Sequence, residues 1–283
     1  MVHVDGVKNI LTVDVEEAFH RNDLHLSRRQ RELLRGRVVA QTEHLIALLR
    51  SSGQRGTFFV LGEVAEQYPA LVKKVAEDGF ELGLHGYHHR LVYEQGEKEF
   101  RRETQEAKDM LERIGEREIV GFRAPSWSIT NQSLWALRVL TDMGFQYDSS
   151  ILPAMAYLGG IHRSHPGIHW RTEAEIIEVP PSIFRLGSFR LPFSGGLYLR
   201  TLPYRFIRYC IRRLNKKGIP AVIYLHPWEM DTELPRLGVG WKGRYALYYN
   251  LQTVQNKVER LLKEFSFAPV CEVLRDADTF CRS

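Results

Sequence analysis

Short β-rich runs alternate with amphipathic helical patterns along almost the whole chain, and this alternation restricts the fold more than any other feature. The β-rich runs are 8–15, 56–61, 80–85, 119–124, 145–149, 175–180, 221–226 and 267–273. The helical patterns between them are 41–52, 69–78, 97–114, 131–143, 203–217 and 251–265. Strands joined through helices form right-handed parallel units, so the order predicts an α/β fold, an irregular (β/α) barrel of about seven parallel strands.

The chain shows no division into separate domains. No linker, low-complexity tract or internal repeat interrupts its 283 residues. We therefore expect one catalytic domain over 1–283, with 235–283 as a C-terminal extension packed on the barrel. The segment 152–171 is expected to be a long loop.

Composition and charge exclude several classes of protein. With 44% hydrophobic and 26% charged residues, the chain has the composition of a globular domain. It lacks an apolar leader and any apolar run long enough to span a membrane, which predicts a cytoplasmic protein. The net charge of +5 comes from scattered basic residues without interleaved aromatic ones, so no nucleic-acid partner is expected. The oligomeric state is not indicated.

The cysteines do not point to a metal or disulfide framework. Cys210, Cys271 and Cys281 are far apart and lack CxxC spacing. They are interpreted as ordinary core or surface thiols.

Side chains capable of chemistry stand at the ends of most predicted strands. They are Asp14, Glu16, His85, Arg123, Asp148, Glu178 and His226. The carboxyl ends of parallel barrel strands meet at one face, where active sites of such barrels lie. A polar residue at one strand end is ordinary, but so many together predict a single active site.

The stretch His85-Gly-Tyr-His-His89 contains two histidines four residues apart. On a helical turn this spacing would place both rings on one face as metal ligands. Two histidines, one carboxylate and an open position for water form a catalytic metal site. Asp14 or Glu16 would supply the carboxylate.

Five motifs in this order resemble those of the polysaccharide deacetylases of carbohydrate esterase family 4. They are TVDVE (12–16), HGYHH (85–89), RAPSW (123–127), YDSS (147–150) and YLHPW (224–228). The later part, with LPFSGGLYLRTLPYRF and YLHPWEMD, is similar to the subfamily that accompanies exosortase-linked exopolysaccharide gene clusters. The resemblance implies a metal-dependent amidase that removes N-acetyl groups from aminosugars of a polysaccharide or lipid-linked glycan and releases acetate.

The resemblance also implies roles for individual residues. Asp14 resembles the general base, Arg123 the residue that orients it, His85 and His89 the metal ligands, and His226 the general acid. The implied metal is Zn²⁺, with Co²⁺, Ni²⁺ or Mn²⁺ as alternatives.

The first motif departs from the usual family pattern of adjacent aspartates, because Val15 follows Asp14. Positions two apart share one face of a strand, so Glu16 is the expected third metal ligand. Glu17 is the alternative ligand, and otherwise a solvated bystander. Gly86 replaces the usual serine or threonine after the first histidine.

Other site residues are less tightly specified. Asp148 is expected to orient His226, with Glu178 as the alternative. Backbone N–H groups of 124–127 are expected to hold the oxyanion. The predicted substrate contacts are Trp127, Trp228 and Pro125, although each tryptophan fits a core position equally well. His162, His165, His169 and Glu229 are left without a role.

Two other functions remain open at this point. One is a metal-dependent amidohydrolase that acts on a small, non-sugar cyclic amide. The other is a carbohydrate-binding protein with a vestigial site.

Overall fold

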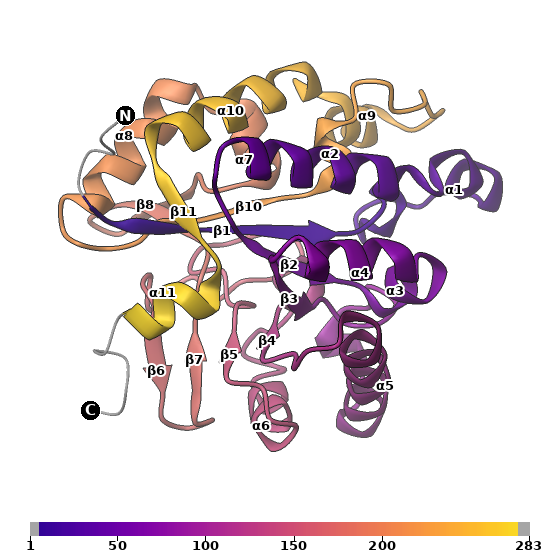
Figure 1. Cartoon of the computed structure of the whole chain (residues 1–283), viewed down its shortest axis with the longest axis horizontal. Coiled ribbons are helices and arrows are strands. Elements are labelled where there is room, and N and C mark those ends of the chain that lie inside the picture. Colours follow the sequence, from indigo (N-terminus) through magenta and orange to yellow (C-terminus); the bar gives the residue numbers. More distant parts are fainter. Residues whose placement is uncertain (1–5, 277–283) are drawn as a thin grey trace.

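The computed structural model describes residues 6–276 and centres on a curled, mostly parallel sheet (Figure 1). The strand order is β10–β1–β2–β3–β4–β5–β7–β6, and only the β6–β7 pair is antiparallel. The strands are β1 (Lys8–Val15), β2 (Thr57–Val60), β3 (Glu81–Leu84), β4 (Gly121–Phe122), β5 (Tyr147–Asp148), β6 (His169–Arg171), β7 (Ile176–Glu178), β10 (Val222–Leu225) and β11 (Ser266–Ala268). A separate hairpin joins β8 (Ile183–Leu186) to β9 (Phe189–Pro192). The predicted irregular parallel barrel is confirmed as a curled half-barrel.

Helices surround this sheet (Figure 1), most of them over its outer face, whereas the last one packs with the inner residue Ile10. They are α1 (Arg28–Leu34), α2 (Arg37–Ser51), α3 (Gly62–Gln67), α4 (Pro69–Glu77), α5 (Glu97–Gly115), α6 (Trp135–Asp142), α7 (Gly196–Thr201), α8 (Tyr204–Asn215), α9 (Trp241–Tyr248), α10 (Val254–Glu264) and α11 (Val270–Asp276). Short 3₁₀ turns follow several strands or precede helices: η1 (Ala18–His20), η2 (Val92–Glu94), η3 (Pro125–Trp127), η4 (Pro227–Met230) and η5 (Leu251–Thr253).

The residues of β1 alternate between two environments. Leu11, Val13 and Val15 join the core formed with the surrounding helices, whereas Ile10 belongs to a separate inner cluster. Because side chains of a strand alternate between its faces, Thr12 and Asp14 share the inner face with Ile10. The sequence period of two therefore aims Asp14 into the barrel.

The C-terminal segment adds to the sheet instead of only lying on it. Strand β11 pairs in parallel with residues 8–10 of β1, while β2 pairs with residues 12–15. On the other side, the outer edge of β10 is partly covered: Tyr224 N donates to Ser194 O at 2.9 Å. The half-barrel is thus bordered by irregular backbone at this edge.

Several element bounds differ from the sequence prediction because distant groups cap the helices. Helix α2 begins at Arg37 instead of 41, since the Glu17 carboxylate accepts the N–H groups of Gly36 and Val38. The predicted strand 267–273 ends at Ala268, and 270–276 is helical. The first turn of this helix is capped by groups on other strands, since Val270 N donates to Thr57 Oγ1 at 2.9 Å. Helix α6 starts at Trp135, not at 131, and the predicted loop 152–171 ends in β6.

Two absences concern only the described residues. Within 6–276, no helix is both long and apolar enough to cross a membrane. Cys210 and Cys271 are free thiols, and Cys281 lies outside the described range.

Candidate active site

A cleft of about 190 Å³ opens at the carboxyl ends of the central strands. Residues from four strand ends line it: Asp14, Glu16, His85, His89, Arg123 and His226. These strands are β1, β3, β4 and β10, so the expected convergence of side chains at one end of the sheet is what the fold produces.

Asp14 and Arg123 form a buried ion pair at the base of the cleft. Arg123 Nη1 donates to Asp14 Oδ1 and to Thr12 Oγ1, each at 2.7 Å. The other guanidinium nitrogens are held by Ser149, through its carbonyl at 3.1 Å and its hydroxyl at 2.8 Å. Arg123 is fully buried and Asp14 is 2% exposed, so the pair has a single fixed geometry.

Glu16, His85 and His89 place three potential metal-ligand atoms within 4.8 Å of one another. Glu16 Oε2 lies 3.6 Å from His85 Nε2 and 2.6 Å from His89 Nε2. Burial raises the pKa of Glu16, but His89 and His85 outweigh it and hold this pKa well below its ordinary value. Glu16 is therefore an anionic oxygen donor between two imidazoles.

The two histidines converge by loop geometry and not through the helical turn that their spacing suggested. The stretch after β3 has no helical assignment, and Gly86 and His89 both adopt left-handed backbone conformations, with φ of 77° and 55°. Glycine takes such a conformation without strain, which gives a physical reason for glycine after His85. His89 reaches the site by a conformation that few non-glycine residues adopt.

The donor set fits a divalent cation. Imidazole and carboxylate are common ligands of Zn²⁺, and tetrahedral ligands at 2.0–2.2 Å stand about 3.3 Å apart. Glu16 Oε2 is buried, and no donor within the described residues, His89 Nε2 at 2.6 Å included, meets it with hydrogen-bond geometry. His85 Nδ1 lies 2.8 Å from Arg123 O, an arrangement that keeps the proton on Nδ1 and directs the Nε2 lone pair to the site.

His226 stands opposite Asp14 and Glu16 and is held by a residue that the sequence prediction left without a role. Its Nε2 lies 3.9 Å from Asp14 Oδ2 and from Glu16 Oε1. Its Nδ1 lies 2.9 Å from Glu229 Oε2, which also accepts the His226 backbone N–H at 3.2 Å. Burial lowers the pKa of His226, but Glu229, with Glu16 and Asp14, outweighs burial and raises it to about 8.

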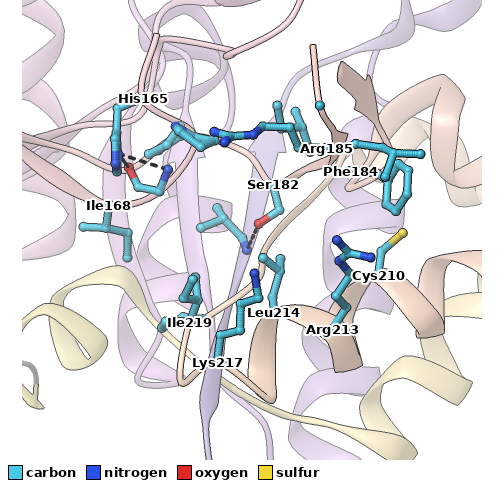
Figure 2. A pocket seen from close by; sticks show the side chains of 18 residues that line it. His165, Ile168, Ser182, Phe184, Arg185, Cys210, Arg213, Leu214, Lys217 and Ile219 are labelled. Carbon is cyan, nitrogen blue, oxygen red and sulfur yellow. Dashed lines mark hydrogen bonds between the residues drawn. The ribbon is translucent and has the colours of Figure 1, made fainter. Parts of the chain in front are cut away.

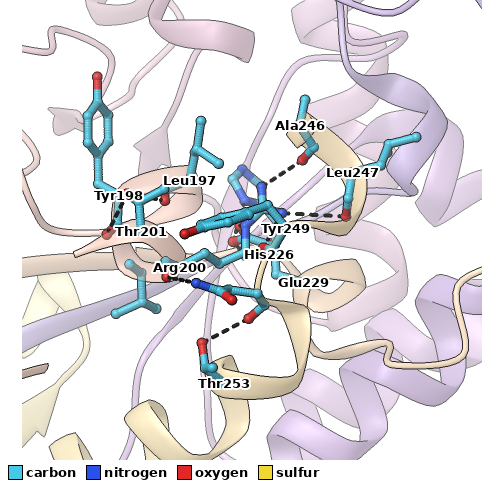
Figure 3. Close-up of polar contacts among 12 residues, drawn as sticks. Leu197, Tyr198, Arg200, Thr201, His226, Glu229, Ala246, Leu247, Tyr249 and Thr253 are labelled. Atoms are coloured by element: carbon cyan, nitrogen blue, oxygen red, sulfur yellow. Dashed lines mark hydrogen bonds and ion pairs between the residues drawn. The ribbon is translucent and has the colours of Figure 1, made fainter. Parts of the chain in front are cut away.

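Glu229 is paired in turn with Arg200 from α7 (Figure 3). Arg200 Nε lies 3.0 Å from Glu229 Oε1, and both side chains are almost fully buried. Arg200 also donates to the Ala246 carbonyl at 2.8 Å and reaches those of Leu247 and Tyr249 at 3.4 Å. A chain of contacts therefore runs from the end of α9 through Arg200 and Glu229 to His226.

The expectation that Asp148 orients His226, with Glu178 as alternative, is wrong, because Glu229 occupies that position. Asp148 instead accepts hydrogen bonds from the hydroxyl and N–H of Ser150. Burial and the adjacent Asp148 charge raise the pKa of Glu178 well above its ordinary value, and burial raises that of Asp148. Both carboxyls are fully buried in the barrel wall, where these shifts favour their protonated forms.

Glu17 is not a solvated bystander, since it is 2% exposed and caps α2. Its oxygens are directed to the helix N-terminus, whereas Glu16 faces the histidines. Burial raises the pKa of Glu17 to about 7. Between these two residues, the geometry favours Glu16 as the ligand.

The predicted substrate contacts separate into one cleft residue and two buried ones. Trp127 lines the cleft, half-buried, with its ring 5.0 Å from that of Tyr224. Trp228 is 1% exposed and packs beside His226 in a core cluster, so it cannot contact a sugar. Pro125 is also buried and packs near Gly86. Closeness in sequence to a motif therefore does not separate the cleft residue Trp127 from the buried residues Trp228 and Pro125.

One further histidine supports the site, and three others lie away from it. The ring of His20 stacks on that of His89 with centroids 6.1 Å apart, and burial lowers the pKa of His20 to about 3. His162 is exposed, His165 contacts Gly167 O, and His169 lies on β6. None of these three lines the described cleft.

Comparisons with known proteins assign two parts of the chain to described families. Residues 36–147 match the family described as polysaccharide deacetylase, and residues 149–275 match a domain of unknown function, DUF3473. A peptidoglycan-N-acetylglucosamine deacetylase from Bacillus cereus is 32% identical over 96 residues, which are 34% of this chain and 35% of that protein. Residues 36–147 carry the polysaccharide deacetylase match, so the family resemblance inferred from the motifs is confirmed, whereas the exopolysaccharide-associated subfamily is not.

Solved structures share the fold at low sequence identity. PuuE allantoinase superposes with a TM-score of 0.66 at 15% identity, over 97% of this chain and 91% of the other. A carbohydrate esterase family 4 pseudoenzyme from Bacillus anthracis has a TM-score of 0.51 at 12% identity, over 94% of this chain and 66% of the other. These likenesses establish the fold and leave the chemistry to the residues of the cleft.

Proposed function

We propose that this protein is a metal-dependent deacetylase that hydrolyses N-acetyl groups of aminosugars in a polysaccharide or lipid-linked glycan and releases acetate. The observation that carries the proposal is that one cleft contains a candidate base, a candidate acid and three potential metal ligands. Asp14 and His226 face each other at 3.9 Å beside the three potential ligands Glu16, His85 and His89. A base, an acid and a cation site together are what amide hydrolysis requires.

In this mechanism Asp14 takes a proton from the attacking water. Arg123 fixes the position of the carboxylate by donating a hydrogen bond to it at 2.7 Å. With a divalent metal, most simply Zn²⁺, held by Glu16, His85 and His89, the site gains a Lewis acid that acidifies the water and polarises the acetyl carbonyl.

Backbone donors for the oxyanion are proposed at Ser126 and Trp127. The Ala124 N–H is already used by Ser150 Oγ at 2.7 Å, and Pro125 has no N–H. Ser126 and Trp127 line the cleft with left-handed φ angles of 52° and 57°. Non-glycine residues in this conformation concentrate at functional sites, and one oxyanion donor typically contributes about 3 kcal/mol.

His226 completes the reaction as general acid. Its Nε2 faces the cleft while Glu229 holds Nδ1, so the Nε2 proton is directed to the departing nitrogen. A raised pKa, to about 8, keeps the imidazole protonated at neutral pH. Acid catalysis of this kind typically contributes about 10²–10⁴-fold.

The walls of the cleft are suited to a sugar. Trp127, Tyr157 and Tyr198 line it, and Tyr157 is 90% exposed. Flat aromatic faces with polar tips pack well on sugar rings. The resemblance to an exopolysaccharide-associated subfamily makes an acetylated exopolysaccharide the first polymer to assay.

We further propose that residues 1–283 act as one catalytic domain, with 235–283 as its C-terminal extension. The contacts of Arg200 with the carbonyls of 246–249 support this, because they connect that segment with His226 through Glu229.

Acetate release from N-acetylhexosamine oligomers by the zinc-loaded protein tests the proposal. Asp14→Asn and His226→Ala should each abolish release while zinc remains bound. Absence of acetate from every acetylated glycan tried, with zinc shown to be present, would exclude a deacetylase.

Two other functions are separated by the same experiment. Turnover of a small cyclic amide without turnover of glycans would indicate an amidohydrolase. A vestigial carbohydrate-binding site would bind oligomers and release no acetate. Retention of Asp14, Arg123 and His226 together favours an enzyme, because a binding protein needs no acid and base.

A further inference from the structure

Figure 2 shows a second pocket, of about 440 Å³. It lies at the opposite end of β10 from the active site. Pro220 and Val222 at the amino end of β10 contribute to it, whereas His226 follows the carboxyl end. Its walls are β8 with Gly187, the segment 165–168, and the C-terminal part of α8 with the turn that follows. The deacetylase cleft and this pocket therefore open at different ends of the sheet.

The pocket combines an apolar wall with unpaired positive charge. Arg185, Arg213 and Lys217 line it, and no aspartate or glutamate is among its described lining residues. None of the three cations forms an ion pair within residues 6–276; Arg213 contacts only the Tyr209 hydroxyl, at 3.2 Å, and the Phe184 ring. The apolar lining includes Phe184, Leu186, Leu214 and Ile219.

The hairpin beside the pocket exposes large apolar side chains at its tip. Leu186 and Phe189 are paired across the two-residue turn and are 63% and 56% exposed. Ile219, across the pocket, is 39% exposed. Scattered exposed hydrophobic residues are ordinary, but here they border three unpaired cations.

We propose that this face, defined by Leu186, Phe189, Arg185, Arg213 and Lys217, docks on a bilayer that contains anionic phospholipid. The cations complement lipid phosphates, and the hairpin tip enters the boundary between headgroups and acyl chains. A small anion inside the pocket would account for the cations but not for Phe189, which lies outside the pocket lining. A helix dipole accounts for cations at the end of α8, but not for Arg185 on the hairpin.

Docking in this way leaves the active-site cleft directed away from the bilayer, because the two lie at opposite ends of β10. The substrate is then a glycan segment that extends from the surface, and not one embedded in it. This inference concerns a different face from the proposed catalysis and does not depend on it.

Cosedimentation with vesicles tests the proposal. Wild-type protein should bind vesicles of phosphatidylglycerol and phosphatidylcholine at low salt and not vesicles of phosphatidylcholine alone. Since one cation near an anionic surface contributes about fivefold to binding, Arg185→Gln with Lys217→Gln should weaken it about 25-fold. The pair Arg28→Gln and Arg29→Gln, exposed on α1, removes the same charge and should change binding less than twofold.

The hairpin provides a second, uncharged test. Leu186→Ser with Phe189→Ser should reduce vesicle binding at least tenfold with no loss of thermal stability, because both side chains are exposed. No binding to anionic vesicles, equal binding to neutral ones, or equal losses in both charge variants would overturn the proposal. So would normal binding of the serine variant, displacement by millimolar inorganic phosphate, or a dimer that the serine substitutions dissociate.

Discussion

Glu229→Gln tests the contact that sets the protonation of His226. The substitution keeps the side-chain volume and removes the negative charge that lies 2.9 Å from His226 Nδ1. The pKa of His226 is raised to about 8 because Glu229, with Glu16 and Asp14, outweighs the effect of burial. Without the Glu229 charge, burial should bring the pKa of His226 to about 6.5, its ordinary value, or below.

The size of the effect follows from the protonated fraction of His226. A group with a pKa of about 8 is half protonated at pH 8, whereas one at about 6.5 is protonated in roughly 3% of molecules. General-acid activity is lost as pH rises through this pKa. Glu229→Gln should therefore lower kcat/KM about 15-fold at pH 8 and less than about twofold at pH 6.

The pH profile of kcat/KM for acetate release, from about pH 5.5 to 9.5, gives the readout. Breaking the buried pair with Arg200 is expected to cost about 3–5 kcal/mol of stability, but this loss does not by itself move the alkaline limb. Glu63→Gln is the matched control, because it removes a carboxylate that lies near two other histidines, His88 and His20, and not near His226. If the alkaline limb of the pH profile does not move in Glu229→Gln, or if kcat/KM falls equally at pH 8 and pH 6, the reasoning is refuted.

Three further predictions concern separate parts of the molecule. Glu16→Gln should weaken zinc binding, measured by titration, roughly a hundredfold or more. Glu17→Gln should retain zinc and lose about 1 kcal/mol of stability from the weakened helix cap. The reverse pattern would make Glu17 the ligand. Trp228→Ala should cost about 3–5 kcal/mol in denaturant unfolding, while Trp127→Ala should mainly raise KM for glycan oligomers; an unaltered KM would remove Trp127 from the substrate site. The raised pKa of Glu178 stabilises the fold below its unfolded-state pKa, and this contribution is lost as pH rises. Relative to wild type, Glu178→Gln should therefore gain up to about 1.36 kcal/mol of stability per unit increase in pH, and parallel stability curves would contradict a raised pKa of Glu178.

The sequence was most informative where a long element carried its own pattern. Eight residues of β1 show a clear period of two, so the inner position of Asp14 could be predicted. Strands β4 and β5 have two residues each, and their ends could be located only through the motifs around them. Helix α11 could not be predicted locally, because its capping groups come from β2 and β3.

Asp148 and Glu178 end other strands that point to the cleft in the sequence, so the sequence alone favours them as partners of His226. A carboxyl buried in the barrel wall and one that serves catalysis look the same in the sequence. The actual partner lies three residues away in the same 3₁₀ turn, where Glu229 accepts from both the ring and the backbone of His226. The signal was present as a carboxylate at i+3, a spacing that places two side chains of one turn side by side.

The three carboxylates at the end of β1 can stand close together because each faces a different partner. Asp14 meets Arg123, Glu16 meets the two histidines, and Glu17 meets the N-terminus of α2. All three are at most 3% exposed, and an unpaired charge at that depth would cost several kcal/mol. The order of the residues therefore divides three tasks among neighbouring positions: proton transfer, cation binding and attachment of the helix that packs on the strand. A shift of one residue in β1 would exchange the partners of all three, so the register of this strand and the chemistry of the cleft are determined together.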